Sequence, residues 1–187
     1  MIRVALMCAS LMLVTTTVVV VAQGGQMTRE EALAAVFPHA GIEAERVFLT
    51  EQQMVRIGEL AGGEVRSALV ARYVATQGGR TVGRAYIDTH VVRTKMESLL
   101  ISLEPDGSVK RIEVTAFQEP PEYQPAQNWL QQYYKQLLTD DLAVQRAIQP
   151  ILGGTLTTGA ANAAVRRVLA MDQVLERGRE EGGAVAR

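Results

Sequence analysis

A run of two glycines and three threonines in the C-terminal third has the clearest chemical potential in this sequence. Gly153 and Gly154 precede Thr155, and Thr157 and Thr158 follow where a helical pattern begins. Glycines let a backbone approach a ligand closely, while hydroxyls and the free N–H groups of a helix start stabilise a phosphate. In the alternative, the glycines close a loop and a threonine caps the helix. The run lacks the lysine of a P-loop and the third glycine of a dinucleotide turn.

Other side chains suited to a site each have a plainer alternative. His90 lies near Asp88 on an expected strand, where it either faces a ligand or lies at the edge of the core. Glu119 and Tyr123 enclose two prolines and a glutamate, a rigid turn that either borders a ligand or simply ends a strand. Arg167, the second residue of an Arg-Arg pair, either contacts a phosphate or an acidic partner or remains solvated.

Capping and hydrophobic patterns indicate the elements that position these residues. Thr28 and Glu31 have the spacing of a capping box, which predicts a helix that stops before Pro38, and a second short helix is expected over residues 50–60. Strands are expected over residues 68–76, 82–92, 98–103 and 109–117, and further helices over residues 126–138, 142–148 and 157–177. This order predicts an α+β fold, an antiparallel sheet of about four strands flanked by helices, with the glycine–threonine loop leading into a C-terminal helix.

The charge balance and the scarcity of cysteine and histidine exclude several classes of function. The chain has 19 Lys plus Arg against 20 Asp plus Glu, so no global basic field exists to hold nucleic acid. Two histidines exclude a multi-histidine metal site, and the single Cys8 excludes a disulfide framework, thiolate zinc and iron–sulfur clusters. We therefore expect neither a nucleic-acid partner nor metal-binding residues.

The N-terminal residues have the arrangement of an export signal. Arg3 supplies a positive charge, residues 4–22 form an uncharged and mostly apolar run, and Ala22 is a small residue suited to signal peptidase. Because roughly 20 such residues span a bilayer, an uncleaved membrane anchor is the alternative. We expect a periplasmic or otherwise extracytoplasmic protein. Its expected parts are a signal peptide or anchor (1–22), a helical N-terminal segment (23–64), a main domain (65–177) and a frayed tail (178–187).

The glycine–threonine run, Gly-Gly-Thr-Leu-Thr-Thr-Gly-Ala-Ala-Asn-Ala-Ala-Val, resembles the flavinylation motif of the FMN-binding domain family. The typical motif is Ser-Gly-Ala-Thr, an apolar residue, two hydroxyl residues and a helix ending in Ala-Val. The resemblance extends in order over residues 80–169. It includes the segment 86–94, the turn 105–107, the turn 119–123 and Trp129-Leu130. This domain is found in the covalent-flavin subunits of sodium-pumping NADH:quinone oxidoreductase and Rnf complexes, and in small exported redox proteins.

By this resemblance, Thr155 is the residue whose hydroxyl is esterified to the phosphate of FMN. In the family a separate flavin transferase makes this bond, with FAD as donor and magnesium as its metal. Three positions before Thr155 depart from the family pattern: Leu152 replaces Ser, Gly154 replaces Ala, and Gln149 stands where many members have Asp. The Ala of the family implies that Gly154→Ala should be tolerated.

The resemblance makes residues 65–177 an FMN-binding domain with covalent FMN as its cofactor. The implied cofactor-binding residues are Thr155, Gly153, Gly154, Leu156, Thr157, Thr158, Glu119, Tyr123 and His90. We identify no catalytic residue in the sequence, so the implied function is an exported electron carrier rather than a stand-alone enzyme. Its redox partner would be a cytochrome or a membrane oxidoreductase. The alternative is a flavin-free structural or sensory subunit of an envelope complex that retains the fold.

Overall fold

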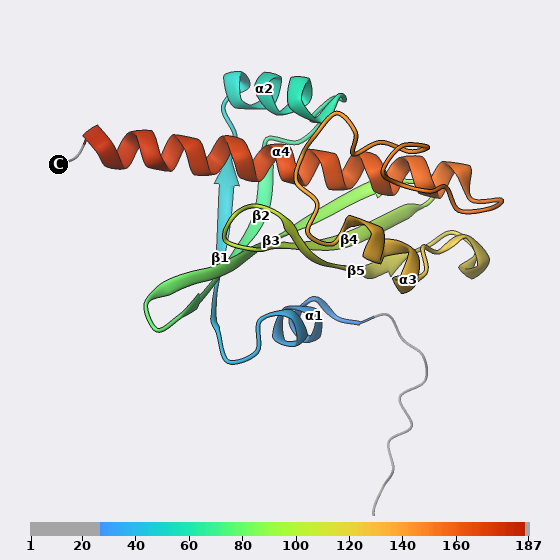
Figure 1. Ribbon diagram of the computed structural model, residues 1–187, viewed down its shortest axis with the longest axis horizontal. Coiled ribbons are helices and arrows are strands. Elements are labelled where there is room, and N and C mark those ends of the chain that lie inside the picture. The colour runs from blue at the N-terminus through green and yellow to red at the C-terminus, as the bar shows by residue number, and fades with distance from the viewer. Residues whose placement is uncertain (1–26, 186–187) are drawn as a thin grey trace, which may run out of the picture.

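A five-stranded antiparallel sheet, with the strands in chain order, forms the centre of the fold (Figure 1). The strands are β1 (Gly41–Phe48), β2 (Leu69–Gln77), β3 (Arg80–Val91), β4 (Met96–Leu103) and β5 (Val109–Phe117). The computed structural model describes residues 27–185. The predicted signal peptide or anchor, with Cys8, lies outside the described residues. Strands β2 to β5 form the predicted meander, and β1 adds a fifth strand at its edge.

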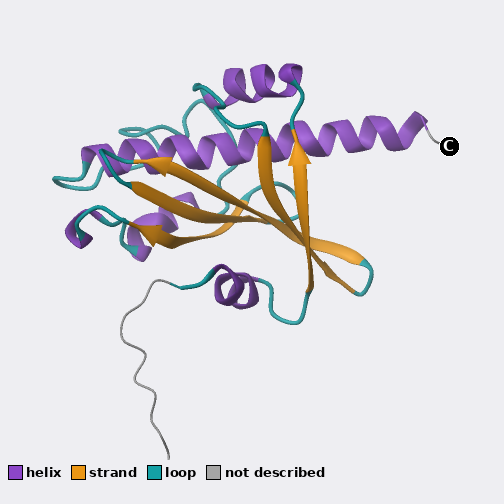
Figure 2. Ribbon diagram, turned by 180° about the vertical axis from the view of Figure 1, so that it is seen from behind, coloured by secondary structure: helices purple, strands orange, loops and turns teal. Residues whose placement is uncertain are grey.

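Helices cover both faces of this sheet (Figures 1 and 2). Helix α1 (Arg29–Val36) lies on one face and the long helix α4 (Thr155–Val185) on the other, with α2 (Glu51–Ala61) packed on the outer side of α4. Short helical turns follow β5: η1 (Pro121–Tyr123), α3 (Gln127–Leu130) and η2 (Gln131–Tyr133). The predicted α+β fold, with a loop that leads into a C-terminal helix, is confirmed.

Both N-terminal helices begin at a capping box. The Thr28 hydroxyl accepts a hydrogen bond from the backbone N–H of Glu31, whose carboxylate in turn accepts from the N–H of Thr28. Thr50 and Gln53 make the same reciprocal pair at the start of α2. Each pair satisfies two backbone donors that a helix start leaves free, which fixes where the helix begins.

The N-terminal segment is not purely helical, as residues 23–64 were expected to be, because it contains β1. This strand pairs with β2 from Gly41↔Thr76 to Phe48↔Leu69. Its residues are exposed or half-buried throughout, so it has no alternation of buried and exposed side chains. The backbone ladder to β2 holds the strand, and this segment therefore belongs to the sheet rather than to a separate helical part.

The helices after the sheet also differ from their expected bounds. The helical turns end at Tyr133 instead of residue 138, and Lys135 then adopts a positive φ of 63°. Residues 142–148 form turns rather than a helix, with Gln145 at φ 66°. A left-handed residue cannot continue a right-handed helix, which explains both differences. Helix α4 (Thr155–Val185) begins two residues before its predicted start.

Two apolar cores lie on opposite faces of the sheet. Tyr86, Leu99 and Ile101 pack with α2 and α4 on one face, while Tyr73 and Ala85 belong to the core beneath α1 on the other. Neighbouring strand positions such as 85 and 86 thus serve different cores, as the two-residue period of a strand requires. Among the residues described, no helix has the length and apolarity to cross a membrane.

Buried ion pairs connect α4 to the sheet. Asp172 accepts hydrogen bonds from Arg84 of β3, with Nε–Oδ1 and Nη2–Oδ2 distances of 2.5 and 2.8 Å, and from the Tyr86 hydroxyl at 2.8 Å. Farther along α4, Glu176 accepts a hydrogen bond from Arg72 of β2. These contacts fix the position of α4 on the sheet, and therefore where its N-terminus lies.

Candidate functional site

Most of the predicted site residues line one cavity of about 360 Å³ at the start of α4. The predicted residues that line it are Glu119, Tyr123, Gly153, Gly154, Leu156 and Thr157. The remaining wall is formed by Val92, Arg93 and Thr94, from the turn after β3, and by Pro120. The structure thus brings together two segments that are far apart in the sequence, residues 119–123 and 153–157. In the sequence, only the resemblance to the family related them to each other. We call this the smaller cavity.

Thr155 is the first residue of α4 and is exposed. Its neighbours Gly154 and Leu156 both line the smaller cavity. The first helical bond of this turn runs from the N–H of Thr158 to the carbonyl of Gly154, at 2.9 Å. The N–H groups of Thr155, Leu156 and Thr157 make no hydrogen bond within the described residues. An exposed hydroxyl therefore lies beside three free backbone donors at the positive end of a helix.

The two glycines before Thr155 are required for different reasons. Gly153 has a φ of 75°, which side chains rarely adopt, and a Cβ atom there would meet nothing within 4 Å. A Cβ atom on Gly154 would instead lie 2.8 Å from Cγ2 of Ile151. Because Ile151 is branched at Cβ, its Cγ2 can move aside only if its χ1 angle or the backbone changes. This contact argues against the expected tolerance of Gly154→Ala, although the family motif has Ala there.

Thr157 and Thr158 have different surroundings. The Thr158 hydroxyl accepts from the N–H of Ile151 and donates to the carbonyl of Gly154, both at 2.9 Å. Thr158 thus fixes the loop and does not line the smaller cavity. Thr157 does line it and is only 2% exposed, yet its hydroxyl makes no hydrogen bond within residues 27–185. An unpartnered hydroxyl on a residue that lines the cavity is free to bond a ligand, so Thr157 is the threonine available for one.

On the opposite wall, Glu119 holds the turn between β3 and β4. One carboxylate oxygen, Oε1, accepts hydrogen bonds from the backbone N–H groups of Thr94 and Lys95, both at 2.8 Å. These bonds hold the pKa of Glu119 below its ordinary value. Arg93 of the same turn lines the smaller cavity, and its guanidinium makes no ion pair within the part of the chain described. Tyr123 lines the cavity with its side chain partly exposed.

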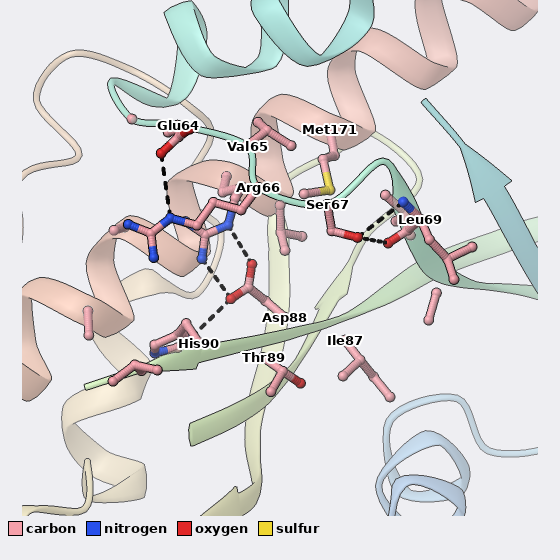
Figure 3. A pocket seen from close by; sticks show the side chains of 18 of the residues that line it. Glu64, Val65, Arg66, Ser67, Leu69, Ile87, Asp88, Thr89, His90 and Met171 are labelled. Atoms are coloured by element: carbon pink, nitrogen blue, oxygen red, sulfur yellow. Dashed lines mark hydrogen bonds and ion pairs between the residues drawn. The ribbon is translucent and has the colours of Figure 1, made fainter. Parts of the chain in front are cut away.

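His90 lines a second cavity instead, of about 700 Å³, which we call the larger cavity. It lies between α4, strands β2 and β3, and the segment 63–67 that joins α2 to β2 (Figure 3). His90 points toward Asp88 in Figure 3, and both belong to β3. The structure thus separates His90 from the other predicted site residues.

A buried charged cluster surrounds His90. Its Nδ1 and Nε2 atoms lie 2.9 Å from Asp88 Oδ1 and from Glu97 Oε2. Asp88 also accepts two hydrogen bonds from Arg167 of α4, with Nε–Oδ2 and Nη2–Oδ1 both 2.7 Å. Arg167, expected to contact a phosphate or to be solvated, is instead held against the sheet. This leaves two cations facing two carboxylates beside the larger cavity.

The cluster shifts the ionisation of its members. Burial opposes the charge of His90, but the hydrogen bonds to Asp88 and Glu97 outweigh it and raise the pKa of His90 to about 9. Burial likewise opposes the charge of Asp88, and the bonds from His90 and Arg167 lower its pKa. His90 is therefore a cation near neutral pH. No group of three or more His, Cys, Asp or Glu in residues 27–185 has the arrangement of a metal site.

Glu97 and Arg93 are the site residues that sequence reasoning missed. Glu97 lies opposite His90 in the β3–β4 register, and only the short turn between these strands could have indicated that pairing. Arg93 lies inside that same turn, where an exposed cation carries no distinctive pattern. The positions of both residues are set by the β3–β4 hairpin, through its strand register and its turn.

Comparisons with protein-family models, with curated proteins and with solved structures found no match for this chain. The relation to the FMN-binding domain family therefore stays a prediction from the motif.

Proposed function

We propose that this chain is an exported one-domain flavoprotein that carries electrons, with FMN attached through its phosphate to Thr155. The observation that carries the proposal is the position of Thr155 at the start of α4, beside the smaller cavity. An exposed hydroxyl there can accept a phosphoryl group, while the helix start stabilises the negative charge.

The residues around Thr155 fit a phosphate ester. The free N–H groups of the first turn and the unpartnered hydroxyl of Thr157 are donors, which the oxygens of a phosphate need. Arg93, on the turn after β3, adds a positive charge to the residues that line the smaller cavity. Glu119 brings a negative charge to the same cavity, but its Oε1 is already engaged by two backbone N–H groups.

FMN supplies one- and two-electron transfer when bound, and the chain supplies attachment, orientation and redox tuning. A flavin transferase that uses FAD and magnesium would make the bond. Because the motif family is exported, the redox partner would be a cytochrome or a membrane oxidoreductase outside the cytoplasm. No residue is assigned to a chemical step, and an electron carrier needs none.

One observation favours a second candidate, a flavin-free structural or sensory subunit that keeps this fold. The family serine before the glycine is replaced by Leu152, whose side chain is 98% exposed and offers no hydroxyl. Gly154 also replaces the family alanine, whose methyl group would lie 2.8 Å from Cγ2 of Ile151 in this structure. A flavin transferase would recognise its substrate through these positions, so their replacement favours a chain that carries no flavin.

A visible absorption spectrum separates the two candidates. The chain would be expressed outside the cytoplasm with and without a flavin transferase, purified by gel filtration and scanned. Flavin absorption bands that accompany the protein only when the transferase is present support the carrier. A colourless, folded protein under both conditions would support the flavin-free subunit.

A further inference from the structure

The two cavities follow one another along the same two elements. On β3 and the turn after it, residues up to Val91 line the larger cavity and residues from Val92 line the smaller one. On α4, Leu156 lines the smaller cavity. Ala160, one helical turn further along the same face of α4, lines the larger cavity. A ligand anchored at the start of α4 therefore has the larger cavity next to it.

One stripe of α4 faces both cavities. Leu156, Ala160, Ala163 and Arg167 follow one another at helical spacing, and each lines one cavity or the other. At 1.5 Å per residue, Ala160 and Ala163 lie about 7.5 and 12 Å along the axis from Thr155. A five-carbon ribityl chain has a comparable reach. The two alanines leave the space that larger side chains would fill.

The larger cavity has both apolar and charged residues in its wall. Val65, Val70, Val168 and Met171 line it and are each at most 8% exposed, while Arg167 is one of the charged residues that line it. Arg167 uses Nε and Nη2 on Asp88, and its Nη1 makes no hydrogen bond within the described residues. A volume of about 700 Å³ lies within the range of small-molecule sites. This arrangement suits a flat, largely apolar ring that has carbonyl oxygens along one edge.

We propose that the larger cavity holds the isoalloxazine ring of the flavin, and that Arg167 donates a hydrogen bond from Nη1 to a ring carbonyl. The identity of the ligand rests on the function proposed above. Asp88 is a positioning residue, because its two bonds hold the guanidinium in place. Ala160 and Ala163 provide the room for the ring.

The charges around this ring site come from four parts of the chain, the fourth being β4 with Glu97. His90 and Asp88 lie on β3, Arg167 lies on α4, and the exposed pair of Glu64 and Arg66 lies on the segment after α2. Glu97, at the floor of the cluster, leaves one buried oxygen without a partner. With Glu97 counted, the cations His90, Arg167 and Arg66 face the three carboxylates of Asp88, Glu97 and Glu64, so the charges around the cavity balance.

Free riboflavin tests the ring site without using Thr155, because riboflavin has no phosphate. The flavin-free chain, expressed without a transferase, is titrated into riboflavin while flavin fluorescence is recorded. Ala163→Leu should weaken binding at least tenfold, and Ala160→Leu serves as a second filling variant. Arg167→Gln should weaken binding about fivefold and Asp88→Asn by a similar factor, with partial recovery in Arg167→Lys.

One control accompanies these variants. Gly159→Leu adds the same side chain to an exposed position of α4 with open space around it, and should leave riboflavin binding within twofold of the parent chain. Circular dichroism melting establishes that each variant is folded.

Three outcomes would overturn the ring site. The first is that the parent chain fails to bind riboflavin, and the second that it binds riboflavin no better than a folded Ala163→Leu or Ala160→Leu chain. The third is that Tyr123→Ala weakens binding while Ala163→Leu and Ala160→Leu do not, which would place the ring in the smaller cavity. A missing covalent adduct at Thr155 would instead count against the proposed function, since riboflavin binding is measured without it.

Discussion

Arg167 of α4 and Asp88 of β3 form a two-point ion pair, with both N···O distances at 2.7 Å. Asp88 is also hydrogen-bonded to His90, whose other nitrogen reaches Glu97 of β4. The helix that begins at Thr155 is thus connected to two strands through four charged groups. Removal of one charge from this group of four should therefore change the positions and charges of the other side chains beside the larger cavity.

The first prediction concerns the pH dependence of stability. Because the pKa of His90 is raised from 6.5 to about 9, its charge stabilises the fold fully below its unfolded pKa and ceases to do so as pH rises through about 9. The free energy of unfolding in urea should fall by roughly 1–3 kcal/mol between about pH 7 and 10 from this group. His90→Asn should show a smaller fall.

His39→Asn is the control for this measurement. His39 has a positive φ of 65°, a conformation that asparagine accepts, so the exchange should not disturb the backbone. Its pH profile should follow that of the parent chain. A His90→Asn profile parallel to the parent would contradict the assigned role of the cluster.

The second prediction concerns the buried pair of Arg84 and Asp172. Asp172→Ala removes the two-point partner of the buried Arg84 guanidinium, which keeps only a contact of 3.6 Å to Glu176 and a bond of 3.3 Å to the Pro105 carbonyl. This change should cost about 3 kcal/mol in the free energy of unfolding. Glu59→Ala removes an exposed partner of Arg56 on α2 and should cost at most about 1 kcal/mol. Urea denaturation of both variants measures the difference. Equal losses would show that the buried pair does not hold α4.

The two capping boxes illustrate how far local patterns carry a prediction of fold. Thr28 and Thr50 start their helices because side chain and backbone bond within four residues, so the sequence alone suffices. Strand β1 could not be predicted in this way. Its side chains are mostly exposed, and its stability comes from backbone bonds to β2, a partner about 30 residues away in the sequence.

Lys135 and Gln145 show the converse limit. The apolar spacing around them is helical, yet both residues adopt positive φ angles, which their residue types do not predict. At the candidate site, Gly153 and Thr157 of the motif both line the smaller cavity. The motif could not distinguish Thr157 from Thr158, because their roles depend on the turn that Ile151 makes before the helix.

The third prediction uses that distinction. Thr158→Val removes two hydrogen bonds that fix the loop and should lower the free energy of unfolding by about 1–3 kcal/mol. Thr157→Val removes a hydroxyl without a partner, so stability should change little while flavin content falls. Denaturation curves and flavin absorbance measure both quantities. A stability loss in Thr157→Val as large as in Thr158→Val would contradict this assignment.

The fourth prediction concerns Gly153. Valine at a φ of 75° should strain the loop by about 1–3 kcal/mol and lower flavin content, since the free N–H groups would shift away from Thr155. Gly153→Asn is the matched control, because asparagine tolerates this conformation and the space around the position is open. Melting temperature and flavin content should both separate the two variants. Full flavin loading of Gly153→Val would show that the loop does not hold the phosphate.

The mass of the denatured protein tests the proposed flavin bond most directly. After co-expression with a flavin transferase, the chain should be heavier than its polypeptide by one FMN less one water, and peptide mapping should place the addition on Thr155. Thr155→Ala should lose it, whereas Thr157→Ala should retain a part. An unmodified mass, or an adduct that survives in Thr155→Ala, would contradict the assignment.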